Sequence, residues 1–238
     1  MHHVQLDRWS RIPSPVHRLD ARVKALAAVA ILVTQVLAAR APAAASGFYF
    51  LLVVSLAVWA RLPVLGLLAR ASLVLPFAGG VAALNLFGGS GERAWSLLAK
   101  SYISACTVLL LLATTPLHEL LRGLETLGVP RFFLMVAQFI YRYLFVISEQ
   151  AQHMMAARRC RAPLPRPGSL LASVAGTLAV LFARSYGRSE RIHQAMLARG
   201  FQGGFALLPP PAVPWGQYFQ LAALAAVLAG IHLLLWKL

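Results

Sequence analysis

Arginine is the residue type whose placement in this sequence points most directly to a chemical role. Two basic clusters, at 158–162 and 198–200, each close a stretch with helical periodicity. A guanidinium group is planar and carries several fixed donors, so it can bridge carboxylates and backbone carbonyls of a partner protein in a way that an ammonium group does not copy. We therefore interpret the clusters as docking points. Their members are Arg158, Arg159, Cys160, Arg161 and Ala162 in the first, and Ala198, Arg199 and Gly200 in the second.

Ordinary helix capping is the competing interpretation of the second cluster. A cation in the last turn of a helix meets the negative end of the helix dipole, and a glycine directly after it can take the left-handed conformation that ends the helix. Ala198-Arg199-Gly200 is a pattern of only three residues. Taken alone, so short a pattern favours helix capping over docking to a partner.

Histidine offers one candidate for metal binding. The terminal amine, peptide nitrogens and an imidazole of His2 or His3 could chelate a divalent ion. Two adjacent histidines on a polar arm are weak evidence, and we expect no metal site in this chain. The other histidines are expected at helix surfaces or in packing contacts, namely His118, His153, His193 and, in the last apolar stretch, His232.

Signatures of catalysis and nucleotide binding do not occur in the sequence. The phosphate-binding pattern G-x-x-x-x-G-K-[ST] is absent, so we expect no ATP and no other cofactor bound by this chain. The few carboxylates are scattered, and Glu149 and Glu190 lie among arginines, where ion pairing is the simpler role. Cys106 and Cys160 lie in different surroundings and imply neither a disulfide nor a zinc site. The sequence therefore predicts a non-catalytic protein.

Composition places the chain in a membrane. Of 238 residues, 59% are hydrophobic and 12% charged, which is too apolar for an ordinary soluble domain. The net charge of +15 could indicate nucleic-acid binding. Because the arginines flank apolar stretches, we attribute the charge to the enrichment of Lys and Arg in cytoplasmic loops and expect no nucleic-acid partner.

The apolar stretches predict an all-α membrane bundle with about five crossings. No cleavable signal peptide is apparent, and Asp20 is expected to cap the first helix. The basic residues concentrate in the N-terminal arm, around 61–70 and within 116–215, so these parts are expected in the cytoplasm, with the chain in the inner cell membrane. Whether 131–148 and 169–183 also enter the bilayer stays open.

The expected spans are 23–39, 47–60, 71–87, 95–115 and 218–236. The chain is expected to divide into four regions. These are an arm at 1–22, four membrane helices within 23–115, a basic helical region at 116–208, and a linker with a last membrane helix at 209–238.

The basic region predicts two long helices. Between Val136 and Met155 apolar residues recur with three-four spacing, and Pro163 must stop the helix that they form. A second helix is expected from about Ser169 to Arg199. Both helices would therefore end in arginine.

Three stretches together resemble a known family. They are 138–149 with the continuation 157–161, the segment 17–24 ahead of the first apolar stretch, and 190–203. In this order they are similar to the transmembrane T component of energy-coupling factor (ECF) transporters, and most similar to its cobalt type, CbiQ. The ordered match reverses the preference for mere capping.

The resemblance implies a function and a set of partners. Such a T component is a non-catalytic subunit with a pair of cytoplasmic coupling helices, each ending in an Ala-Arg-Gly motif that inserts into a groove of one of two ATP-binding, CbiO-like subunits. It transmits their motion to a CbiM-like substrate-binding membrane subunit, with or without a small CbiN-like subunit, for cobalt uptake. The second motif is Ala198-Arg199-Gly200, whereas the first aligns with Cys160-Arg161-Ala162 and keeps only its arginine. Either Arg161 or the adjacent Arg158-Arg159 could therefore make the main contact.

Other functions stay open at this point. The substrate could be nickel or a vitamin rather than cobalt, because its choice would lie in another subunit. A different class is a membrane-embedded enzyme that holds phosphorylated lipid with its arginines. Such an enzyme needs acidic metal ligands or a nucleophile near the arginines, and the sequence has no cluster of that kind.

Overall fold

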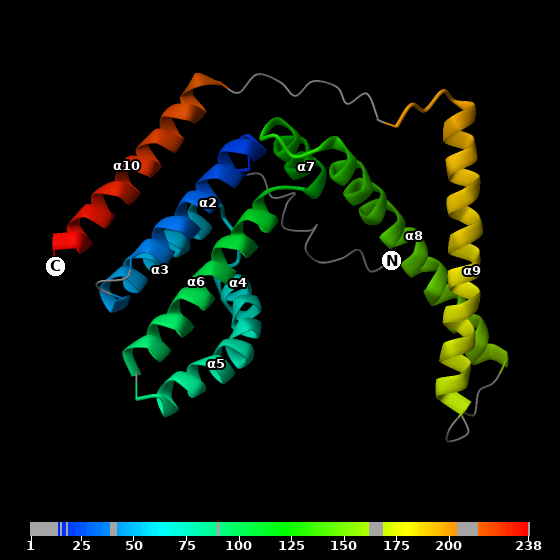
Figure 1. Cartoon of the computed structure of the whole chain (residues 1–238), viewed down its shortest axis with the longest axis horizontal. Coiled ribbons are helices and arrows are strands. Elements are labelled where there is room, and N and C mark those ends of the chain that lie inside the picture. The colour runs from blue at the N-terminus through cyan, green and yellow to red at the C-terminus, as the bar shows by residue number, and fades with distance from the viewer. Residues whose placement is uncertain are drawn as a thin grey trace. The chain divides into compact units, whose positions relative to one another are not determined.

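The computed structural model describes residues 14, 16–17, 19–38, 42–89, 91–161, 169–203 and 214–237 (Figure 1). Within these residues every regular element is a helix, so the all-α class is confirmed. Two compact units are formed, one by Met1–Leu127 with Pro210–Leu238 and the other by Gly128–Pro209. The first unit holds α2 (Ala21–Leu37), α3 (Pro42–Trp59), α4 (Val64–Ala71), η1 (Ser72–Val74), α5 (Leu75–Phe87), α6 (Gly91–Thr114), α7 (Leu117–Thr126) and α10 (Trp215–Lys237), and the second holds α8 (Arg131–Arg161) and α9 (Ser169–Ala198).

The first two helices begin at residues suited to helix starts. Asp20 accepts a hydrogen bond from the backbone N–H of Arg22 at 2.9 Å, which confirms the predicted N-cap of α2. The expected apolar span 47–60 falls mostly within α3, which begins earlier, at Pro42. Proline is favourable in the first turn, where its fixed φ suits the helix and its missing N–H has no helical partner to lose.

The segment between α3 and α6 is one helical stretch that begins earlier than the expected span 71–87. Helices α4 and α5 are joined by the short 3-10 helix η1 without an intervening loop. Pro76 lies in the first turn of α5, where the lack of a backbone N–H costs little. Val64–Phe87 is consequently long and apolar enough to cross a bilayer.

Further helices have the dimensions of membrane spans. Gly91–Thr114 and Arg131–Arg161 are also long and apolar enough to cross, while Ala45–Trp59 and Trp215–Ile231 are shorter apolar helices. A crossing needs about 20 apolar residues at a rise of about 1.5 Å each. These lengths support the assignment of the chain to the membrane.

The core of the first unit lies between α3 and α6. Tyr49, Val53 and Ala57 recur on one face of α3 and are buried, as are Cys106 and Leu110 on α6. Small residues on such faces let helices approach closely, which favours dispersion contacts in lipid.

Two side chains of α2 fix its direction relative to α6. The Lys24 ammonium donates to the carbonyl of Thr114 at 3.0 Å, and the Gln35 amide donates to the carbonyl of Lys100 at 3.0 Å. The later residue of α2 thus meets the earlier residue of α6, so the two helices run antiparallel. Helix α10 also packs on α2 (Figure 1).

Candidate functional site

Two long helices carry the arginine clusters. Helix α8 has 31 residues and includes all of the predicted helix 136–155, and α9 has 30 residues and begins at Ser169, as the sequence indicates. At about 1.5 Å per residue each is roughly 45 Å long. Figure 1 shows that α8 and α9 cross each other within their unit.

A side-chain contact fixes the place where the two helices meet. The Arg188 Nη2 atom of α9 donates a hydrogen bond to the Gln150 Oε1 atom of α8 at 3.2 Å. Arg161 follows Gln150, and Arg199 follows Arg188, by the same number of residues, about three helical turns or roughly 16 Å. Measured along each helix, the two arginine ends therefore lie equally far from the residues that form this contact.

The first arginine end is the last turn of α8. Arg158, Arg159 and Arg161 all lie in that turn. Arg159, Cys160 and Arg161 are exposed, while Arg158 is half-buried. Ala162, which the sequence analysis includes in this cluster, lies outside the described residues.

The second arginine end is built by a capping motif. The N–H of Gly200 donates to the carbonyl of Leu197, and the N–H of Phe201 donates to the carbonyl of Met196, each at 3.0 Å. This is the Schellman pattern, and it requires the left-handed conformation that Gly200 adopts at φ +79°. The expected capping is therefore confirmed. The same motif holds Arg199 at the tip of α9, where it and its neighbours Ala198 and Gly200 are exposed.

The arginine charges at both ends are available to a partner. Among the described residues, none engages Arg158, Arg159, Arg161 or Arg199 in an ion pair or a side-chain hydrogen bond. Glu149, the acidic residue nearest in sequence to the first cluster, instead lies 3.8 Å from His153. An exposed guanidinium with unused donors is suited to a carboxylate or carbonyl on another protein.

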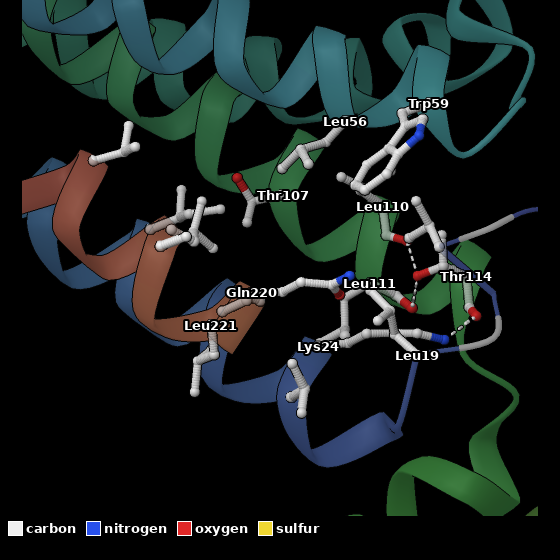
Figure 2. Close-up of a pocket in the computed structure, with 18 residues that line it drawn as sticks. Leu19, Lys24, Leu56, Trp59, Thr107, Leu110, Leu111, Thr114, Gln220 and Leu221 are labelled. Atoms are coloured by element: carbon white, nitrogen blue, oxygen red, sulfur yellow. Dashed lines mark hydrogen bonds between the residues drawn. The ribbon is translucent and has the colours of Figure 1, made fainter. Parts of the chain in front are cut away.

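A second polar site surrounds the start of α2 (Figure 2). Besides Thr114, the Lys24 ammonium reaches the carbonyl of His17 at 3.2 Å, and Lys24 is 7% exposed. The carbonyl of Thr114 belongs to the last turn of α6, which has no helical donor of its own, so Lys24 caps that helix with a positive charge. The backbone N–H of Asp20 donates to Gln217 of α10 at 2.8 Å.

Helix α7 completes this second site. A Cβ atom built on Gly123 of α7 would lie 3.3 Å from the backbone nitrogen of Arg22 and 3.5 Å from the Cβ atom of Ala21. The backbones of α7 and α2 are therefore in direct contact. Lys24 lies in the segment 17–24, which resembles the family, but no role for it was predicted from the sequence. A lysine one turn into an apolar helix is the signal that could have marked it.

Among the described residues no group of three or more His, Cys, Asp or Glu side chains is placed to hold a metal ion. His118 lies 4.0 Å from Glu119 at the surface, and His193 is exposed. The arm with His2 and His3, and the side chain of His232, lie outside the described part of the chain.

These features define an all-α membrane protein with a basic helix pair. The family described as CbiQ, cobalt transport protein, matches residues 13–209. The chain is 32% identical over 208 residues to the cobalt transport protein CbiQ of Rhodobacter capsulatus, covering 86% of this chain and 80% of that protein. This chain therefore belongs to the CbiQ cobalt transport protein family and is a component of a membrane transporter.

Two more relatives match over shorter regions. The nickel permease LarQ of Lactiplantibacillus plantarum is 29% identical over 126 residues, which cover 52% of this chain and 44% of LarQ. The putative fused cobalt transport protein CbiMQ of Methanocorpusculum labreanum is 28% identical over 116 residues, which cover 49% of this chain and 19% of that protein.

Proposed function

We propose that this chain is the transmembrane coupling subunit of an ECF-type importer for cobalt. In this role the arginine ends of α8 and α9 insert into grooves on two ATP-binding, CbiO-like subunits. The chain itself binds no ATP and catalyses no reaction. The observation that carries the proposal is the pair of exposed arginine ends, held at equal distances from one crossing contact.

The proposed docking residues are those of the two clusters. Arg161 and Arg199 are the principal contacts, because each closes its helix and carries unused donors. Arg158, Arg159 and Cys160 support the first contact, and Ala198 and Gly200 support the second. Ala162 belongs to the first motif by its place in the sequence. An arginine at a helix tip can enter a narrow groove, since its long side chain extends beyond the backbone.

The proposed mechanism is mechanical. When ATP draws the two ATP-binding subunits together, their grooves carry the arginine ends, and the crossing at Gln150 and Arg188 makes α8 and α9 move as a pair. The chain continues from α7 through Gly128 into α8, and α7 rests directly on α2 through Gly123. Motion of α8 can therefore reach the membrane helices without passing through a long loop.

The partner that receives this motion is a CbiM-like substrate-binding membrane subunit, with or without a small CbiN-like subunit. A relative of this chain is a putative fused CbiMQ protein, and such a fusion supports a physical association of the two parts. The arm at 1–22 and the coupling helices are assigned to the cytoplasm, in an inner-membrane protein with several crossings. Exposed Phe132, Phe133, Ile140 and Leu144 on the first half of α8 favour a position of that half against the bilayer.

The central test replaces Arg161 and Arg199 together with alanine in the assembled transporter. We expect loss of cobalt uptake and of co-purification with the ATP-binding subunits. The matched control replaces Arg142 and Arg184, which are exposed arginines of the same two helices away from their ends. Uptake and assembly should persist in the control. Equal behaviour of the two double variants would contradict the docking roles.

Nickel is the second candidate substrate, because the relative LarQ is a nickel permease. Uptake of radioactive cobalt and nickel by the same reconstituted transporter distinguishes the two. Preferential cobalt uptake supports the first candidate. Preferential nickel uptake would leave the coupling role intact and reassign the cargo.

A further inference from the structure

A pocket of about 370 Å³ opens between α2, α3, α6 and α10 in the first unit (Figure 2). Apolar side chains make up nearly all of its lining, among them Ile31, Leu56, Leu110 and Leu224. Trp59 of α3 lines it too and is 54% exposed, so the pocket reaches the surface of the unit. An apolar pocket of this size in a membrane protein is suited to a hydrocarbon chain from the surrounding bilayer.

The two threonines in the lining are already satisfied. Thr107 and Thr114 donate their hydroxyl groups to the carbonyls of Ile103 and Leu110 in their own helix, each at 2.9 Å. Their hydroxyl protons are therefore not available to a ligand in the pocket. The polar side chains that remain to recognise one are Lys24 and Gln220, and Gln220 extends from α10 into the same space (Figure 2).

Lys24 has unused capacity for an anion. An ammonium group has three N–H donors, and two are directed at the carbonyls of Thr114 and His17. Within the described residues no carboxylate lies within 4 Å of the Lys24 ammonium, although Glu119 of α7 and Asp20 act on it electrostatically from a longer distance. A buried cation is stabilised when an anion completes its contacts.

We propose that this pocket holds one acyl chain of an anionic membrane phospholipid, whose phosphate group contacts the Lys24 ammonium. The apolar lining selects a hydrocarbon chain, and the single cation at one end of the pocket selects a head that carries a negative charge. Lys24 lies in the first turn of α2 and beside the last turn of α6, and helix ends of membrane proteins lie near the headgroup level. A neutral lipid would fill the same volume but leave the ammonium group without an anion in direct contact.

The binding can be measured by fluorescence quenching of Trp59. The full chain is reconstituted into bilayers of equal composition, in which the brominated acyl chains are carried either by phosphatidylglycerol or by phosphatidylcholine. The contribution of Trp59 is the difference between the wild-type chain and Trp59→Phe. We expect brominated phosphatidylglycerol to quench Trp59 with at least about fivefold higher relative affinity, because one lysine near an anionic lipid surface is worth about that factor.

Variants of the pocket test the site itself. Lys24→Met should abolish the preference for the anionic lipid, and Lys24→Arg should keep it. Ala223→Phe fills the pocket and should reduce quenching by both lipids, whereas Ala222→Phe, an adjacent exposed residue outside the lining, should not. This pair keeps the test valid even if Lys24→Met does not fold.

Three results would overturn the proposal. Equal quenching by the two brominated lipids in the wild-type chain would show that the pocket does not select charge. An unchanged preference in Lys24→Met would remove Lys24 from the recognition. The same response of Ala223→Phe and Ala222→Phe would show that the quenching lipid lies outside the pocket.

Discussion

The guanidinium group of Arg188 donates a hydrogen bond to the side-chain oxygen of Gln150 at 3.2 Å, and this contact joins the two helices that carry the arginine ends. Its partners lie 38 residues apart in the chain, on different helices. This contact therefore restrains the two helices that carry the proposed docking arginines, at a point away from the arginines themselves.

Loss of this contact should loosen the helix pair. We predict that Arg188→Ala weakens the crossing by about 1 kcal/mol, because one hydrogen bond to a charged donor is lost at a partly buried position. Spin labels on cysteines introduced at the exposed positions Ala157 and Ala195, in a Cys160→Ser background, should give a broader distance distribution by pulsed electron resonance.

The matched control is Arg184→Ala, one turn earlier on α9 and exposed. It should leave the distance distribution unchanged. An equally broad distribution in the control would show that loss of any arginine from α9, and not loss of the Arg188–Gln150 contact, loosens the helix pair.

Gly200 should be replaceable only by residues that tolerate the left-handed conformation. At φ +79° an alanine costs about 1 kcal/mol or more, whereas asparagine costs less. We predict that affinity for the ATP-binding subunits falls in the order glycine, asparagine, alanine, valine, measured by titration of the purified subunits. Full affinity of Gly200→Val would contradict a role for the cap in holding Arg199.

Gly123 should tolerate no larger side chain. A Cβ atom there would lie 3.3 Å from the nitrogen of Arg22, so Gly123→Leu must push α7 away from α2, and we predict destabilisation by about 1–3 kcal/mol. Thermal unfolding of the chain in detergent measures it. Gly176→Ala is the control, since no atom lies within 4 Å of its added Cβ, and it should be neutral or slightly stabilising.

Gln35 presents a buried polar group that is only half satisfied. It is 1% exposed, its amide nitrogen donates to Lys100, and within the described residues its side-chain oxygen has no hydrogen-bond partner. Gln35→Met should therefore be close to neutral, while Gln35→Glu should destabilise the chain by about 2 kcal/mol or more, because it buries a charge. Equal melting temperatures of the two variants would refute the burial argument.

The two native cysteines can test the membrane orientation. Cys160 is exposed at the end of α8, and Cys106 is buried in α6. We predict that a membrane-impermeant maleimide labels Cys160 in inverted membrane vesicles and not in spheroplasts, because the coupling helices are assigned to the cytoplasm. Cys160→Ser should abolish the labelling. Labelling of intact spheroplasts would reverse the proposed topology.

Local features of the fold could be predicted from the sequence. The cap at Asp20, the start of α9 at Ser169 and the glycine that ends it each depend on a few neighbouring residues, whose conformational preferences are strong. The start of α3 at Pro42 is harder to predict, because proline can follow the end of one helix or begin the next, and the tertiary structure decides which.

The contacts between distant segments could not be predicted in this way. Lys24 and Thr114 are separated by 90 residues, and no spacing rule indicates that the ammonium of one caps the helix of the other. The crossing of α8 and α9 is also a tertiary feature, since the periodicity of each helix defines its apolar face but not its point of contact with another helix. The sequence indicated the arginines that we propose as docking residues, whereas the contact between their two helices required the structure.

The Gln150–Arg188 contact divides α8 and α9 into a short part and a long part of the same relative lengths. From the Gln150–Arg188 contact, each helix extends about 16 Å to its arginine end and about 28 Å back to its first residue, at about 1.5 Å per residue. If each helix pivoted as a rigid rod at its contact residue, a displacement of its arginine end would be about 1.7 times larger at its first residue. A small displacement of the arginine ends by the proposed ATP-binding subunits would then produce a larger displacement at the first residue of α8.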